Sequence, residues 1–142
     1  MGSSFESRIF YSPDHSGGRG QNAENRAVNI IGTSRYVESV IHHPLNSNAD
    51  RQGKDLTVFI NDQLAIDRVF VQVKASSSVK RQFWDKLKRK GLSTRAERVE
   101  WMSEEAYVLL VVGERSNDEI LADFENQLLE VDYHWVASRR DR

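Results

Sequence analysis

The 142-residue sequence predicts an α/β domain in which a mixed sheet of about four strands lies between helices. Residues 55–60 and 69–74 alternate apolar and polar side chains with the period of two that strands show. Residues 107–112 are continuously apolar, as in a strand buried on both faces. Segments with helical periodicity precede and follow these strands. The expected order is helix, three strands, helix, strand, helix.

The first helix is expected from Asn22 to about Ile31, where apolar residues recur on one side, and Gly32 ends it. Residues 1–21 are expected to form a flexible lead-in. Their Gly-Gly-Arg-Gly run could meet a phosphate through backbone amides. It lacks the preceding strand and the following Lys-Ser/Thr that a P-loop needs, so we expect a loop there.

A strand is expected from Tyr36 to His43, and Pro44 closes it before a long polar loop at residues 45–54. His42 and His43 are adjacent, so they face opposite sides of that strand. Two such side chains cannot chelate one ion simply. Surface or hydrogen-bonding roles are therefore expected for both histidines.

The stretch from Asp55 to Lys74 is the expected centre of the domain, two strands joined by a polar turn. A symmetric hairpin pairs Asp55 with Gln72 and Leu56 with Val71. A slip of one residue would set valines against polar positions, so the pattern specifies this register. Asp55, Gln72 and Lys74 then share one face of the hairpin, and the other face belongs to the core.

A basic amphipathic helix is expected from Ser78 to Lys90, ended by Gly91. Its apolar side contains Val79, Phe83, Trp84 and Leu87. Phe83 and Trp84 could stack on nucleic-acid bases, but their spacing favours core packing.

The charge of the chain is unevenly distributed. The net charge is −1, yet residues 74–98 carry nine basic residues against two acids. Such a local excess attracts polyanions, although a solvated helix face is the simpler alternative. The residues expected to contact phosphates are Lys80, Arg81, Lys86, Lys88, Arg89 and Lys90.

Capping-box spacing predicts two further helices. Thr94 with Glu97 opens a short helix through Trp101, and Ser116 with Glu119 opens the final helix. The inward residues of the final helix are expected to be Ile120, Leu121, Phe124, Leu128 and Leu129. We find no repeat or linker, so residues 22–138 are expected to form a single domain followed by a basic tail at 139–142.

Composition limits the class of protein. There is no cysteine, hence no disulfide framework or thiolate chemistry. The longest apolar run is residues 106–112, far shorter than a membrane span. The N-terminus lacks the basic-then-apolar pattern of a signal peptide. We expect a cytoplasmic protein with no membrane partner.

The hairpin has an acid at the start of its first strand and, in its second strand, an acid or glutamine two residues before a lysine. This pattern resembles the PD-(D/E)xK nuclease superfamily. The matching residues are Lys54-Asp55 and Gln72-Val73-Lys74. The element order over residues 22–130 is similar to the αβββαβ core of that superfamily. Two departures stand out: glutamine replaces the usual acid, and Lys54 stands where the family often has proline.

The resemblance implies a restriction-endonuclease-like fold and metal-dependent hydrolysis of DNA, with Mg²⁺ or Mn²⁺ as cofactor. Asp55 would supply the principal carboxylate, with the Gln72 amide oxygen and the Val73 carbonyl beside it. Lys74 would orient or activate water and stabilise developing charge. Glu24 would be an outer or second-metal ligand, although an acid in a first helical turn also favours the helix N-terminus.

Several functions stay open at this stage. A restriction, homing or junction-cutting endonuclease is expected first, and a non-catalytic nucleic-acid-binding or regulatory protein with the same fold is the alternative. A protein-interaction module is a third. Because Gln72 is neutral, Glu24 or Glu38 becomes more important for holding a metal. The alternative for Asp55, Gln72 and Lys74 is a purely structural role, as a hydrogen-bonded and salt-bridged polar edge of the sheet.

Nucleases of this fold commonly act as homodimers or larger homo-oligomers, because cutting two strands needs two sites. The resemblance therefore implies self-association. The 107–112 strand and the regions of Trp101 and Trp135 are candidate interfaces.

Overall fold

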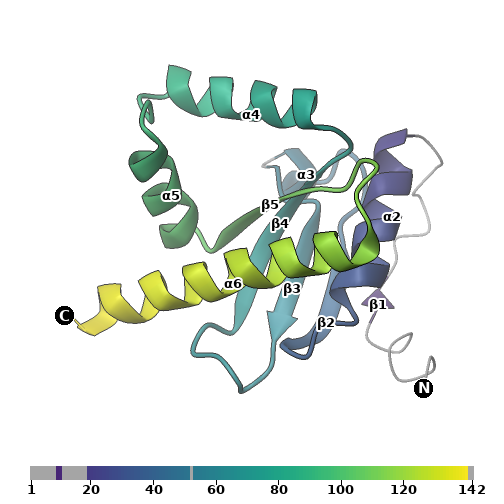
Figure 1. Ribbon diagram of the computed structural model, residues 1–142, viewed down its shortest axis with the longest axis horizontal. Coiled ribbons are helices and arrows are strands. Elements are labelled where there is room, and N and C mark those ends of the chain that lie inside the picture. The colour runs from purple at the N-terminus through teal and green to yellow at the C-terminus, as the bar shows by residue number, and fades with distance from the viewer. Residues whose placement is uncertain (1–8, 11–18, 52, 141–142) are drawn as a thin grey trace.

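A five-stranded mixed sheet forms the centre of the computed structural model, which describes residues 9–10, 19–51 and 53–140 (Figure 1). In spatial order the strands are β1 (Ile9–Phe10), β2 (Val37–His42), β3 (Leu56–Ile60), β4 (Arg68–Lys74) and β5 (Tyr107–Val111). The two outer pairs are parallel and the two central pairs are antiparallel. The expected mixed α/β sheet is confirmed, with the short β1 as an additional edge strand.

The helices complete the expected αβββαβ order. They are α2 (Arg19–Ile31), α3 (Asn48–Arg51), α4 (Ser77–Arg89), α5 (Arg95–Glu104) and α6 (Asn117–Arg140). α3 lies in the segment that was expected to be loop. None of these described helices is long and apolar enough to cross a membrane.

The beginning of α2 differs from the expectation. The helix starts at Arg19, and β1 precedes it, so regular elements extend into the range assigned to a lead-in. Glu24 consequently lies beyond the first turn of α2, which contains no acid. The alternative role of Glu24 as a charge at the helix N-terminus is therefore wrong.

The hairpin of β3 and β4 has the predicted register, with Leu56 opposite Val71 and Val58 opposite Val69. All four side chains are fully buried. Figure 1 shows α6 crossing in front of the sheet beside α2, and both helices pack on this apolar face.

Most of the expected inward side of α6 is confirmed. Ile120, Phe124 and Leu128 are fully buried, and Leu121 packs partly against the core. Leu129 is 40% exposed, so its assignment to the core is wrong. It follows Leu128 directly, and one residue turns an α-helix by more than a quarter of a revolution, which carries Leu129 away from the sheet.

The second face of the sheet is partly covered by α4 and α5. Met102, Tyr107 and Leu109 form a small core there, against which Phe70, Trp84 and Trp101 pack. The predicted core packing of Trp84 is thus confirmed. The side chains of Val79, Lys80 and Phe83 lie outside the described residues.

The free edge of β5 is closed by a side chain of α6. Gln127 Nε2 donates to Leu109 O at 2.9 Å, and Leu109 N donates to Gln127 Oε1 at 3.1 Å. One amide thus reproduces the pairing that a neighbouring strand would give. Around Leu109 the backbone groups of this edge are therefore already paired within the chain.

Truncating Phe124 should test the core. Phe124→Ala should lower the free energy of unfolding by about 3–5 kcal/mol, because it removes a fully buried ring and leaves a cavity. Leu129→Ala is the matched control on the same helix and should cost less than about 1 kcal/mol. Urea unfolding followed by circular dichroism measures both, and equal losses would contradict the described packing.

Candidate functional site

Asp55 directly precedes β3, and its side chain is held against β4. Its backbone N–H donates to Val71 O at 2.9 Å, which continues the strand pairing. Val73 N donates to Asp55 Oδ2 at 2.7 Å, and the Asp55 side chain is buried. Because Val73 lies between Gln72 and Lys74, this bond fixes the carboxylate against the Gln-Val-Lys segment. The structure thus brings Asp55, Gln72, Val73 and Lys74 together at one end of the hairpin.

Glu24 approaches from α2, on the apolar face of the sheet. Its Oε1 lies 3.0 Å from Nε2 of His42, whose side chain is fully buried. His43 faces the opposite way, with Nε2 2.6 Å from Thr57 Oγ1. The prediction of opposed, hydrogen-bonded histidines is confirmed, but sequence reasoning missed His42 as the partner of Glu24. The alternation of β2 placed His42 on the core face and could have indicated a buried polar contact.

The ionisation of Asp55 depends on its burial and on neighbouring charges. Burial, followed by the negative charge of Glu24, raises the pKa of Asp55 to about 7, and Asp50 adds a smaller effect in the same direction. The bond from Val73 N–H opposes this shift. Ionisation of the Asp55 carboxyl group is therefore unfavourable in the folded protein.

Lys74 is half-buried at the same end of β4. Burial lowers the pKa of its amine, the negative charge of Asp55 opposes that shift, and Lys86 lowers the pKa further. Among the described residues no direct ion pair joins Lys74 to Asp55. The lysine is thus near the carboxylate without neutralising it by contact.

Gln72 is engaged by Tyr107, a partner that sequence reasoning did not assign. The Tyr107 hydroxyl lies 2.6 Å from Gly53 O and within hydrogen-bond distance of Gln72 Oε1. Gly53 has φ +80°, and a Cβ there would meet Tyr107 Oη at 3.0 Å. The glycine therefore permits the close approach of three polar groups beside Asp55.

The oxygens at this end of the sheet suit a hard divalent cation. In the described part of the chain, no hydrogen bond is assigned to Asp55 Oδ1 or Glu24 Oε2. Gln72 Oε1 and the Val73 carbonyl are further oxygens of the kind that Mg²⁺ and Mn²⁺ accept. No group of three or more His, Cys, Asp or Glu side chains is preassembled among the described residues. The donor set fits a cation held by two carboxylates and neutral oxygens, not by a carboxylate cluster.

A groove of about 720 Å³ opens beside these residues, between α2 and the segments that follow β4 and β5. Ala23 and Ala75, the chain neighbours of Glu24 and Lys74, line it. Arg26, which also lines the groove, donates to Gly113 O at 3.1 Å and to Arg115 O at 2.6 Å. These bonds join α2 to the segment that follows β5.

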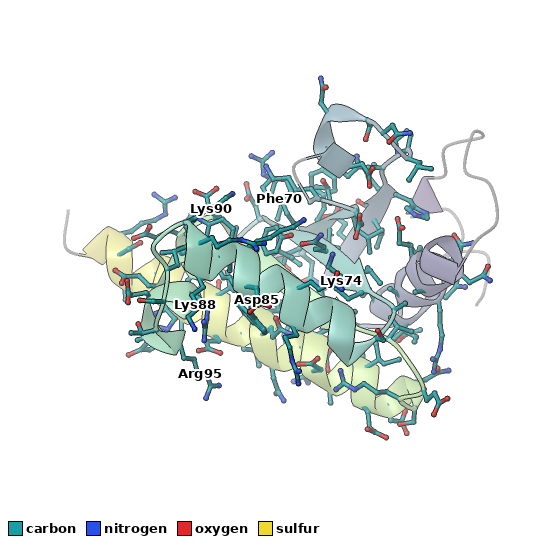
Figure 2. The ribbon with its side chains drawn as sticks, turned by 90° about the horizontal axis from the view of Figure 1, so that it is seen from above. Phe70, Lys74, Asp85, Lys88, Lys90 and Arg95 are labelled. Atoms are coloured by element: carbon teal, nitrogen blue, oxygen red, sulfur yellow. The ribbon has the colours of Figure 1, made fainter. Side chains whose placement is uncertain are left out.

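The basic residues of α4 do not all face the site. Lys86 and Lys90 are four residues apart and share one flank of the helix, whereas Lys88 projects from the opposite flank. Figure 2 shows Lys90 on the same side of α4 as Phe70, and Lys88 on the side of Arg95. Lys86 is close enough to affect the pKa of Lys74. The residues proposed from sequence therefore divide into two groups.

The helical positions of the remaining basic residues of α4 show on which flank they lie. Arg81 shares the flank of Lys88, two turns away, and Arg89 is exposed between the two flanks. The side chain of Lys80 lies outside the described residues.

Lys54 adds a positive charge that sequence reasoning treated only as a departure from the motif. Its Nζ lies 4.1 Å from the centroid of the Phe70 ring, a cation–π contact beside Asp55. We call Lys54, Lys74, Lys86 and Lys90 the site-facing basic surface. It joins Lys54, before β3, and Lys74 of β4 with two lysines from the C-terminal part of α4; Lys74 and Lys90 are labelled in Figure 2.

No family model, curated protein or solved structure matches this chain. Functional conclusions therefore depend on the geometry and chemistry of the site.

Replacing Asp55 with asparagine should stabilise the protein above neutral pH. The folded-state pKa of about 7 exceeds the ordinary value of 3.8, so the folded state binds more protons than the unfolded state between these values. The free energy of unfolding of the wild type should therefore fall as pH rises from about 4 to about 7. At pH 8, Asp55→Asn should be more stable than the wild type by up to about 4 kcal/mol.

Urea unfolding at pH 5 and pH 8 checks this expectation. The advantage of Asp55→Asn should shrink at pH 5, where Asp55 is already protonated. Asp62→Asn, at an exposed position in the hairpin turn, should show no such pH-dependent gain. A variant that is less stable than the wild type at pH 8 would show that the Asp55 charge is compensated.

Proposed function

We propose that this protein is a metal-dependent endonuclease of the PD-(D/E)xK type that hydrolyses DNA phosphodiester bonds. The observation that carries the proposal is the 2.7 Å hydrogen bond from Val73 N to Asp55 Oδ2. It sets an acid, an amide and a lysine around one backbone position at the end of the hairpin. Asp55 is buried and has no direct ion pair among the described residues. A polar edge with a purely structural role would not need such a carboxylate.

Each side chain has a role in this proposal. Asp55 and Glu24 would hold a Mg²⁺ or Mn²⁺ ion, with the Val73 carbonyl as a neutral ligand. When bound, such an ion would supply Lewis acidity and lower the pKa of water. Lys74, whose pKa is lowered by burial, orients the attacking water and stabilises the charge that develops on the phosphate.

The amide of Gln72 can join the ligand set by a half-turn of its side chain. Tyr107 has one hydroxyl proton but lies against two oxygens, Gly53 O and Gln72 Oε1. If the Gln72 amide is turned so that Nε2 donates to Tyr107, Tyr107 can donate to Gly53. All three groups are then satisfied, and Oε1 is released to face the cation.

The site-facing basic surface supplies the affinity for DNA. Lysines that neutralise backbone phosphates give sequence-independent, salt-dependent binding. Lys86 and Lys90 can position a strand over Lys74, and Lys54 extends the surface past Asp55. This arrangement supports non-specific backbone contacts and assigns no recognised base sequence.

Cutting both strands of a duplex calls for two copies of such a site, and we infer a homodimer or larger homo-oligomer. Leu129 and Tyr133 support this inference, because they lie one turn apart on α6 and are 40% and 70% exposed.

Cleavage of plasmid DNA with Mg²⁺ or Mn²⁺ tests the proposed chemistry. Lys74→Ala should reduce the nicking rate by at least about 100-fold, because the positioned amine is lost. Lys88→Ala removes the same charge from the far flank of α4 and should leave the rate within about threefold. Chelation with EDTA should abolish cleavage by both the wild type and the control. Equal rates for the two variants would remove Lys74 from the mechanism.

DNA binding tests the two flanks of α4 separately, in Ca²⁺ or without metal so that cleavage does not interfere. The double variant Lys86→Ala/Lys90→Ala should weaken binding by about tenfold or more at 0.15 M salt and reduce the salt slope by about two. Arg81→Ala/Lys88→Ala removes the same number of charges and should have a smaller effect. Fluorescence anisotropy of a labelled duplex measures both. A larger loss for the second pair would place the DNA on the opposite flank.

A non-catalytic DNA-binding protein with the same fold is the alternative. It is favoured by the neutral Gln72 and by the lack of a preassembled three-residue metal group among the described residues. DNA binding that depends on Lys86 and Lys90, with no cleavage of linear, supercoiled or branched DNA, would support this alternative.

A further inference from the structure

A second cavity, of about 370 Å³, is lined in part by Tyr107, whose hydroxyl contacts Gln72. It is enclosed by α4, α5, β5 and α6, away from Asp55 and Lys74. Its lining consists of Trp84, Arg95, Arg98, Met102, Ser103, Tyr107, Leu109, Asp123, Gln127, Glu130 and Val131. The volume is at the small end of the range for small-molecule sites.

Part of the lining is apolar and aromatic. Tyr107 and Leu109 of β5 are buried in its wall, and Trp101 packs against Tyr107 with ring centroids 5.6 Å apart. The indole of Trp84, which is half-buried, forms another wall. Such rings favour a flat ligand that can pack against their faces.

Ser103 is a polar residue of the lining and is only 4% exposed. Its hydroxyl makes no hydrogen bond among the described residues, and because it is not one of their fully buried atoms it is open to the cavity. A ligand with a hydrogen-bonding edge would satisfy it.

The charges of the lining favour an anionic group. Arg95 and Arg98 contribute two positive charges from α5, and Arg98 lies 5.1 Å from the centroid of the Trp84 ring. Asp123 is already neutralised by Arg115, at 2.9 Å, so Glu130 is the remaining negative charge. The nearby basic residues of α4 strengthen the positive field at the opening.

We propose that this cavity binds a nucleotide. The base lies against Trp84 and hydrogen-bonds to Ser103, and the phosphate is held by Arg95 and Arg98. The same chemistry has two sources, a free mononucleotide and the terminal nucleotide of a nucleic-acid strand. Binding here needs neither the metal nor cleavage, so this proposal can fail or succeed independently of the proposed nuclease activity.

Binding of AMP and adenosine, with EDTA present to exclude metal, tests the proposal. Equilibrium dialysis should show saturable binding of AMP and binding of adenosine about tenfold weaker, because adenosine lacks the phosphate. Arg95→Ala should weaken AMP binding by about tenfold and leave adenosine binding unchanged. Ser103→Ala should weaken both ligands, whereas Arg35→Ala, at an exposed position two residues before β2, should alter neither.

A short adenine oligonucleotide distinguishes the two sources. Binding of the oligonucleotide without AMP, weakened by Arg95→Ala and by Ser103→Ala, would assign the cavity to strand ends. Urea unfolding of each variant shows whether it is folded. If neither ligand binds the folded wild type, or if folded Arg95→Ala and Ser103→Ala bind as the wild type does, the nucleotide site is refuted.

Discussion

The bond between the Val73 amide and the Asp55 carboxylate determines the geometry of the candidate site. It forms only if β3 and β4 pair in the observed register, which in turn depends on Leu56, Val58, Val69 and Val71 filling the core. A slip of one residue would bury polar side chains and move the acid to the wrong face. The same packing that stabilises the sheet thus positions Asp55 beside Lys74.

The charged groups of the site are in electrostatically unfavourable positions, and the stability of the rest of the fold keeps them there. Asp55 is buried near Glu24, and Lys74 is half-buried without a direct ion pair to Asp55 among the described residues. His42 holds Glu24 in place from the buried face of β2. Carboxylates and lysines with perturbed pKa values are typical of functional sites, where a ligand can supply the missing charge. A cation between the carboxylates would provide that compensation.

Local patterns in the sequence were sufficient to predict the αβββαβ order, the hairpin register and the Thr94–Glu97 capping box, but they missed β1 and α3. They could not reveal contacts between residues distant in the chain. Glu24 meets His42, Gln72 meets Tyr107, and Gln127 closes the edge at Leu109, each through packing of separate elements. Periodicity also placed Leu129 in the core, because too many positions of α6 were assigned to its buried side. Counting charges along the sequence identified the basic helix. It could not show that Lys86 and Lys90 lie on one flank of this helix and Lys88 on the other.

The most direct test of the central claim is calorimetric titration of the protein with Mn²⁺ at pH 8, without DNA. We predict one saturable site in the wild type and loss of that site in Asp55→Asn, with Asp62→Asn binding as the wild type does. Such a result would establish the hairpin end as a cation site. Equal Mn²⁺ binding by the wild type and Asp55→Asn, or no binding by either protein, would contradict the account.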